Sequence, residues 1–275
     1  MSNRTKIASF LTITLFSSLL VIGGNNLKSI KLENPSQATP STQLTVSAAA
    51  SLKTAMEKIK PIYEQSYPGI EIIYNFSSSG SLQRQIEQGA PVDIFISAAK
   101  SKMDDLEQQD LLLTETRQNL LINQIVLITP LENSKNQLKL RNFKDLTTQK
   151  IDKIALGEPN SVPAGKYAQE VLNFFDIADR VNDRAIYAKD VRQIVNYVAT
   201  GNVDAGIVYR TDAQVADNVA IAAIAPETSH SPVIYPIAVM KDSVRPKPAI
   251  ELVEFLSTPE AQEVFKEYGF VAINN

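Results

Sequence analysis

Short strand-like runs alternate with stretches of helical apolar spacing from residue 43 to the end of the chain. The runs cover residues 44–47, 71–75, 93–97, 125–129, 153–156, 185–188, 206–209, 219–222 and 234–239. Between them apolar residues recur with the period of an amphipathic helix, as at Val191, Ile194, Val195 and Val198. This alternation predicts an α/β protein, in which helices flank largely parallel sheets.

The length of 275 residues suits one large domain or two smaller ones. A charged, amide-rich stretch at 132–150 indicates a surface excursion after the strand at 125–129, and a proline-punctuated stretch precedes the last long strand. We therefore expect the chain to leave the first domain and return to it. The predicted domain I is 44–125 plus 236–275 and domain II is 126–235, with a hinged cleft between them.

The N-terminus is typical of an export signal. Arg4 and Lys6 precede an apolar run at 7–22, which Gly23 and Gly24 end. We assign 1–24 to a signal peptide with an open cleavage point and 25–43 to a disordered lead-in, which places the protein in the periplasm. An uncleaved membrane anchor is the alternative, although sixteen apolar residues are short for a spanning helix. The absence of cysteine excludes disulfides and lipidation at a signal-peptide cysteine.

The side chains needed for common catalytic sites are scarce. The one histidine, His230, lies in a polar stretch, no G-x-S-x-G motif exists, and zinc or redox sites that need cysteine are excluded. The segment at 157–166 departs from a phosphate loop at Asn160, and Tyr167 stands where that motif needs Ser or Thr. A net charge of −3 argues against a nucleic-acid partner. We expect neither an enzyme nor a cofactor.

Four segments instead place small, uncharged donors between a predicted strand and a predicted helix: AAASL at 48–52, FSSSGSL at 76–82, VPAGKY at 162–167 and AKDVR at 188–192. A helix N-terminus carries unpaired N–H groups and partial positive charge, so several that converge make an anion receptor without cationic side chains. Pro163 fits the first position of a helix, which leaves the N–H groups of Ala164 and Gly165 unpaired, and Asp190 fits the N-cap of the next helix, which leaves the N–H of Val191 free. Ordinary alternatives are Ser51 as an N-cap, the serine cluster as a turn and Tyr209 as a core aromatic.

Taken together, several strings resemble the molybdate-binding protein family of bacterial ABC-type molybdate importers, in order from about residue 44 to 271. They are AAASL, the serines before LQRQIE, GAPVDIFISA, TRQNLL, GEPNSVPAGKYA, DVRQIV, GIVYRTDA and FKEYGF. The resemblance implies a two-domain periplasmic binding protein of the type II kind, with a tetrahedral oxyanion held between its domains. It further implies a monomer that delivers molybdate, and tungstate, to a membrane permease.

The resemblance also implies the ligand-binding residues, which would contact the oxygens of the oxyanion and not the metal atom itself. They are Ser51 and Ser79 from the first domain, and Ala164, Val191 and Tyr209 from the second. Ser78 is the alternative second serine, because the family pattern varies there. Binding of another oxyanion such as sulfate, and an exported serine hydrolase using Ser51 or Ser79, remain the alternative functions.

Overall fold

The computed structural model describes residues 41–131 and 140–273. The predicted signal peptide, most of the lead-in and part of the expected surface excursion at 132–150 lie outside these residues. The first described strand begins at Thr42, so the end of the predicted lead-in at 25–43 is ordered strand. No helix in the two described ranges has the length and apolar character required to cross a membrane.

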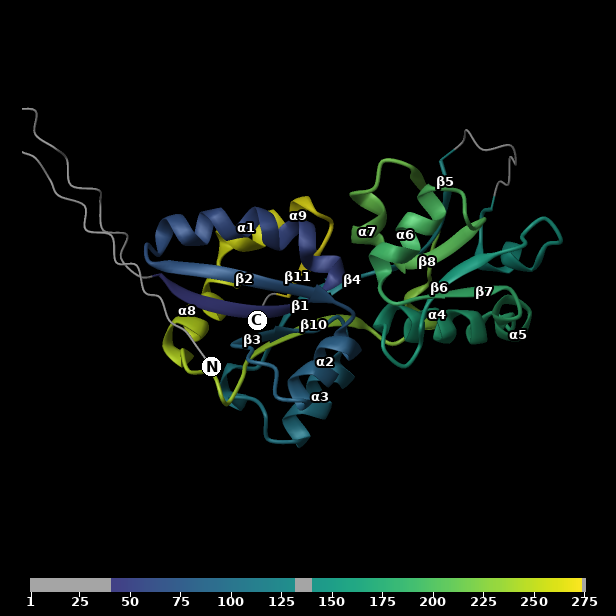
Figure 1. The fold of residues 1–275 in the computed structure, drawn as a ribbon. Helices are drawn as coiled ribbons and strands as arrows, with labels where there is room; N and C mark the ends of the chain where they lie inside the picture. Colours follow the sequence, from purple (N-terminus) through teal and green to yellow (C-terminus); the bar gives the residue numbers. More distant parts are fainter. Residues whose placement is uncertain (1–40, 132–139, 274–275) are drawn as a thin grey trace, which may run out of the picture. The chain divides into compact units, whose positions relative to one another are not determined.

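A six-stranded sheet and its helices form what we call the first lobe (Figure 1). Its strands, in the spatial order β11-β4-β10-β3-β1-β2, are β1 (Thr42–Ala49), β2 (Ile70–Ser77), β3 (Ile94–Ile96), β4 (Gln118–Asn123), β10 (Val233–Val239) and β11 (Val271–Ala272). Its helices are α1 (Lys53–Ser66), α2 (Ser79–Glu87), α3 (Lys100–Gln108), α8 (Pro246–Leu256) and α9 (Pro259–Glu267), with the 3-10 turns η1 (Ala50–Leu52) and η2 (Thr114–Thr116).

A five-stranded sheet and its helices form the second lobe. Its strands, in the order β7-β6-β8-β5-β9, are β5 (Ile125–Pro130), β6 (Ile154–Gly157), β7 (Ala185–Ala188), β8 (Ala205–Tyr209) and β9 (Val219–Ile224). Its helices are α4 (Pro163–Phe174), α5 (Ala178–Asn182), α6 (Val191–Ala199) and α7 (Arg210–Gln214), with the 3-10 turns η3 (Phe143–Thr147) and η4 (Glu227–Ser229).

Both faces of the first lobe's sheet are buried, and successive side chains of a strand point to opposite faces. In β3, Ile94 and Ile96 belong to the main core, whereas Phe95 belongs to a separate cluster with residues of α2 and α3. Figure 1 shows α1 and α9 on one face of this sheet and α2 and α3 on the other. Because β1 and β2 are parallel, the helical segments that follow them begin at the same end of the sheet.

The α/β class is confirmed, but the expectation of largely parallel sheets needs correction, because both sheets are mixed. β1 pairs in parallel with β2 and β3, and β6 pairs in parallel with β7 and β8, whereas β4, β5, β9, β10 and β11 make antiparallel pairs. Parallel neighbours need a crossover that returns the chain to the same end of the sheet. β4 and β5 belong to different sheets, and the chain passes between them through Gln124 alone. β5 therefore enters the second sheet without such a crossover, and it pairs antiparallel with both of its neighbours, β8 and β9.

The chain passes between the lobes twice, from β4 to β5 and from β9 to β10. Ile125 already belongs to β5 of the second lobe, and β10 begins at Val233 in the first lobe. The predicted boundaries instead put Ile125 in domain I (44–125 plus 236–275) and Val233 in domain II (126–235). The division into these two domains stays a prediction. The strand β4, the short strand β11 and helices α5 and α7 were not predicted from the sequence.

Candidate functional site

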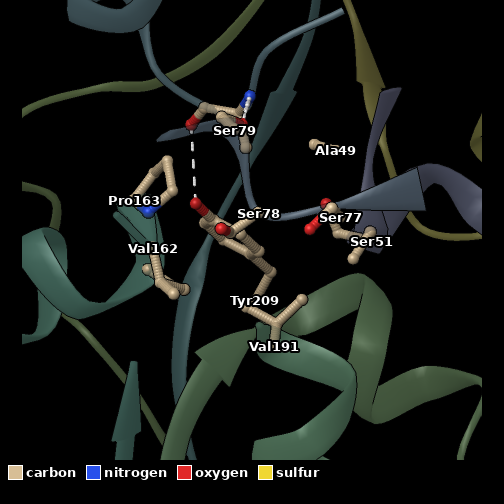
Figure 2. Close-up of a pocket in the computed structure, with 12 residues that line it drawn as sticks. Ala49, Ser51, Ser77, Ser78, Ser79, Val162, Pro163, Val191 and Tyr209 are labelled. Atoms are coloured by element: carbon tan, nitrogen blue, oxygen red, sulfur yellow. Dashed lines mark hydrogen bonds between the residues drawn. The ribbon is translucent and has the colours of Figure 1, made fainter. Parts of the chain in front are cut away.

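A small pocket lies where both lobes contribute the ends of strands and the starts of helices. It is lined by Ala49, Ala50, Ser51, Ser77, Ser78, Ser79 and Ala98 from the first lobe and by Val162, Pro163, Ala164, Val191 and Tyr209 from the second. Figure 2 shows these side chains gathered around that of Tyr209. The empty space within it, open solvent included, is about 200 Å³. The pocket therefore suits a small ligand.

All five residues predicted to bind the ligand line this pocket. Their role as ligands stays a prediction, but the structure brings them together from segments spread over residues 51–209. None of the twelve described lining residues has a lysine, arginine, aspartate or glutamate side chain. The polar groups available to a ligand are hydroxyls and backbone N–H groups.

Ser51 is buried in the turn η1, directly after β1. Its side chain caps no helix, because Ala49 is the N-cap of η1 and Leu52 that of α1. The alternative explanation of Ser51 as an N-cap is therefore wrong. Its Oγ instead lies 2.9 Å from the Tyr235 hydroxyl oxygen. This partner comes from β10, so a contact distant in sequence holds the Ser51 side chain in place.

Ser79 and Ser78 differ in what their hydroxyls do. Ser79, the first residue of α2, is fully buried, and its Oγ accepts a hydrogen bond of 2.9 Å from the Ala98 N–H. Ser78 is the N-cap residue, and its hydroxyl donates to Ser81 Oγ at 2.9 Å. The Ser79 proton is thus available to a ligand, whereas the Ser78 proton is already used within its own turn. This difference favours Ser79 as the second donor.

The second lobe presents backbone N–H groups at the starts of α4 and α6. Pro163 occupies the first position of α4, as predicted, and the N–H of Ala164 has no hydrogen-bond partner in the described ranges. The N–H of Gly165, which we expected to be free as well, donates to the Val162 carbonyl at 2.8 Å. The first turn of α4 closes one residue earlier than expected, so α4 offers one donor fewer.

At the start of α6, the Asp190 carboxylate caps the helix as predicted. It accepts a hydrogen bond of 2.9 Å from the Gln193 N–H, one turn further along. The N–H of Val191 is not used by this cap and has no partner among the described residues. Two helix starts of the second lobe, with their partial positive charge, thus face the pocket.

Tyr209 ends β8, and its ring is almost completely buried. Its hydroxyl donates to the Ala98 carbonyl of the first lobe over 3.4 Å, one of the bonds drawn in Figure 2. Burial raises the pKa of Tyr209 well above its ordinary value, so the phenol keeps its proton at neutral pH. The hydroxyl is therefore a donor, and its long bond to a carbonyl is one that a charged acceptor would replace with a stronger one.

The lobes also touch directly beside the pocket, at Gly80. Its N–H donates to the Ser161 carbonyl of the second lobe at 3.0 Å. A Cβ atom on Gly80 would lie 2.7 Å from both the Ser161 Cα and carbonyl oxygen, so only glycine permits this approach. Arg192 Nη1, at an exposed position, lies 3.4 Å from Thr54 Oγ1 and makes a further link between the lobes.

Three buried polar residues near the pocket were missed by sequence reasoning: Asn123, Tyr235 and Asp212. Asn123 donates to the hydroxyl oxygens of Tyr235 and Thr211, at 3.1 Å and 2.9 Å. Asp212 has one carboxylate oxygen without a hydrogen-bond partner in the described part of the chain, and burial raises its pKa to about 7. Asp212 lies in the string GIVYRTDA but was given no role. No short motif marks Asn123 or Tyr235, because their partners come from distant strands.

The serine-hydrolase alternative finds no histidine beside either serine. His230 Nδ1 lies 2.8 Å from the Ser231 carbonyl oxygen, and its ring packs against Tyr167. Ser51 Oγ is hydrogen-bonded to the phenol of Tyr235, and Ser79 Oγ accepts from the backbone N–H of Ala98. Within the described ranges, His, Asp and Glu side chains form no group of three that could hold a metal ion.

Comparison with known proteins identifies relatives of this chain. The profile of a family described as bacterial extracellular solute-binding proteins matches residues 44–271. A Bacillus subtilis protein named "Putative ABC transporter substrate-binding lipoprotein YvgL" is 40% identical over 94% of this chain and 96% of its own length. The molybdate-binding protein ModA of Haemophilus influenzae is 36% identical over 84% of this chain and 91% of its own.

A solved structure has the same fold. The periplasmic molybdate-binding protein of Azotobacter vinelandii superposes with a TM-score of 0.75 and covers 84% of this chain and 100% of its own. Its sequence is 23% identical, so this likeness bears on the fold alone.

Proposed function

This chain belongs to the family of bacterial extracellular solute-binding proteins, and from that premise we propose that it captures molybdate, and also tungstate, for an ABC importer. The observation that carries the proposal is the pocket between the lobes, with five uncharged donors and no ionised side chain among its described lining residues. The donors are the hydroxyls of Ser51, Ser79 and Tyr209 and the N–H groups of Ala164 and Val191. The names of several relatives support molybdate as the ligand.

Uncharged donors suit an anion that is fully deprotonated. Each hydroxyl or N–H directs a hydrogen at one of the anion's oxygens, and a hydrogen bond to a charged group contributes roughly 1.5 to 3 kcal/mol. Molybdate and tungstate carry two negative charges and no proton near neutral pH. A protonated phosphate would bring an O–H group that needs an acceptor, and the described lining residues include no carboxylate to receive it.

Sulfate resembles molybdate in charge and shape, so the pocket must reject it by size. Sulfate is the smaller ion, and donors held at fixed positions would lose contact with part of its surface. The recorded partners support such fixed positions, because Ser51 and Ser79 are each held by a hydrogen bond of 2.9 Å. We therefore infer selection by size, with a binding site that does not shrink around the smaller ion.

Delivery would depend on the two lobes closing around the ligand. The donors are divided between the lobes, so the anion stabilises the closed arrangement over an open one. The closed form is then the one for a membrane permease to recognise. We infer export to the periplasm, and we propose that the protein works as a monomer, since a single chain supplies all five donors.

Calorimetric titration of the purified protein with molybdate, tungstate, sulfate and phosphate tests this proposal. We expect tight one-to-one binding of the first two and far weaker, though measurable, binding of phosphate and sulfate. Ser51→Ala should weaken molybdate binding about ten- to hundredfold, the loss of one charge-assisted hydrogen bond. Ser66→Ala is the matched control, because Ser66 is exposed and bonds only to the Ile62 carbonyl.

Each contrary result has a definite meaning. Sulfate bound as tightly as molybdate would contradict selection by size and indicate a general carrier of dianions. Unchanged molybdate affinity in Ser51→Ala would remove Ser51 from the ligand-binding residues. Absence of heat with every oxyanion would refute the proposed function.

A further inference from the structure

A chain of three buried side chains leads from the junction between the lobes to the pocket. Asn123 ends β4, the strand from which the chain first crosses to the second lobe. Its side-chain nitrogen lies 3.1 Å from the hydroxyl oxygen of Tyr235, on β10, and that oxygen lies 2.9 Å from Ser51 Oγ. Asn123 and Tyr235 do not line the pocket, so they reach a ligand only through Ser51.

The direction of the first bond follows from the backbone. The N–H of Gln124 can only donate, and it lies 2.9 Å from the Asn123 side-chain oxygen. The other side-chain atom of Asn123 must then be the NH₂ group. Its two hydrogens have two recorded acceptors, the hydroxyl oxygens of Thr211 and Tyr235. Asn123 is therefore a fixed donor to Tyr235.

The direction of the second bond follows from the first. The Tyr235 hydroxyl has one proton, and Ser51 Oγ is the one recorded partner that can accept it, since the Asn123 nitrogen donates. Tyr235 is fully buried, and burial raises its pKa well above the ordinary value, so the phenol keeps this proton at neutral pH. A buried hydroxyl proton without an acceptor is unfavourable, which sets Tyr235 as the donor and Ser51 as the acceptor.

We propose that Asn123 and Tyr235 are positioning residues, which direct the Ser51 hydroxyl proton into the pocket and so make the site selective for anions without an acidic proton. This inference rests on the proposed function of the same pocket. Because Ser51 Oγ accepts the Tyr235 proton, Tyr235 cannot accept the Ser51 proton in return. The Ser51 proton has no acceptor among the described residues, so it turns toward the ligand. A ligand that brings an O–H group meets a donor at this position and loses a hydrogen bond.

Ser79 is directed in the same way by a simpler arrangement. Its Oγ accepts from the backbone N–H of Ala98, which can only donate. Both serines of the pocket are therefore held by donors on the side away from the ligand. Asn123 also donates to Thr211 on α7 of the second lobe, so the direction of the Ser51 proton depends on contacts with both lobes.

A double-mutant cycle between Ser51 and Tyr235 tests the proposal. Tyr235→Phe removes the hydroxyl and keeps the ring, which packs against Tyr209 and Phe270. We expect it to weaken molybdate binding about tenfold, and to have less than a threefold effect when Ser51 is already alanine. Tyr74→Phe is the matched control; it removes a tyrosine hydroxyl that bonds to the Met56 carbonyl in the same lobe, and should leave affinity unchanged.

Selectivity gives a readout that a purely structural role would not change. We expect the ratio of molybdate to phosphate affinity to fall about tenfold or more in Tyr235→Phe, because the freed Ser51 hydroxyl can rotate and accept from a protonated anion. If Tyr235→Phe does not fold, Asn123→Leu replaces it in the cycle and should show the same dependence on Ser51.

The outcomes separate the two proposals. If the wild-type protein binds molybdate but the effects of Ser51→Ala and Tyr235→Phe are additive, or if the ratio of affinities is unchanged, the positioning role is refuted alone. If the wild-type protein binds no oxyanion, the proposed function is refuted, and this inference with it.

Discussion

Replacement of Gly80 by alanine tests whether the closed arrangement of the lobes is the one that binds the ligand. Gly80 is the second residue of α2, and its φ angle does not lie in the left-handed region that favours glycine. Alanine is therefore compatible with the backbone of α2 and favours the helix by about 1 kcal/mol. This gain applies whether the lobes are open or closed, so it does not affect the balance between the two forms.

The closed form alone is penalised. The added Cβ would lie 2.7 Å from the Ser161 Cα and carbonyl oxygen and 3.0 Å from the carbonyl carbon. Carbon atoms in favourable contact lie about 3.5 to 4.0 Å apart, so the backbones must separate by about 1 Å at this point. Overpacking of this kind costs about 1 to 3 kcal/mol, which corresponds to about five- to 150-fold weaker binding. The bond of 3.0 Å from the Gly80 N–H to the Ser161 carbonyl would also lengthen.

Calorimetric titration with molybdate measures the effect of Gly80→Ala. Gly201→Ala is the control, since its Cβ would have open space but its φ of 70° disfavours alanine. That control should lower the melting temperature and leave affinity unchanged, whereas Gly80→Ala should lower affinity and leave the melting temperature of the ligand-free protein unchanged or higher. Wild-type affinity in Gly80→Ala would refute the conclusion that the contact between Gly80 and Ser161 belongs to the ligand-binding form.

Three further predictions concern the serine cluster, a helix cap and a buried carboxylate. Ser79→Ala should weaken molybdate binding about tenfold or more, whereas Ser78→Ala should weaken it less than threefold, because the Ser78 proton is already donated to another serine. Titration measures both, and equal losses would contradict the choice of Ser79. Asp190→Ala should lower the free energy of unfolding by about 1 kcal/mol in urea denaturation, whereas Asp190→Asn, which keeps a capping oxygen, should not. Burial raises the pKa of Asp212 from 3.8 to about 7, so the folded protein holds a proton there that the unfolded chain loses above about pH 4. The free energy of unfolding should therefore fall by about 3 kcal/mol between about pH 4 and pH 7 relative to Asp212→Asn, and parallel pH profiles of the two proteins would contradict this.

Much of the candidate site could be predicted from the sequence because local rules determine it. Pro163 at the first position of α4 and the Asp190 cap of α6 both occur as predicted, since a helix start is specified by a few adjacent residues. The alternation of strands and helices was sufficient to predict the α/β class. The resemblance then selected Ser51, Ser79 and Tyr209 from among many polar residues, and the structure brings them to one pocket.

Other features could not be predicted because their causes are distant in sequence. The strand β4 carries the polar residues Gln118, Asn119 and Asn123 near its ends, which obscures its alternation, and its partners β10 and β11 lie more than a hundred residues away. The sheets were expected to be largely parallel because the pattern of strands and helices gives no sign of the direct passage from β4 to β5. The position of Ser51 in the sequence also allowed a capping role, whereas its actual partner, Tyr235, comes from β10.

The same distinction separates two kinds of donor in the pocket. A backbone N–H at the start of a helix has a fixed direction, so Ala164 and Val191 are donors as soon as α4 and α6 form. A serine hydroxyl can rotate, and it becomes a fixed donor only when another group occupies its oxygen. For Ser79 that group is a nearby backbone N–H, but for Ser51 it is a side chain from β10, itself fixed by a residue of β4. Which residues line the pocket is therefore largely a local property of the chain, whereas the proposed selectivity against protonated anions depends on the assembled fold.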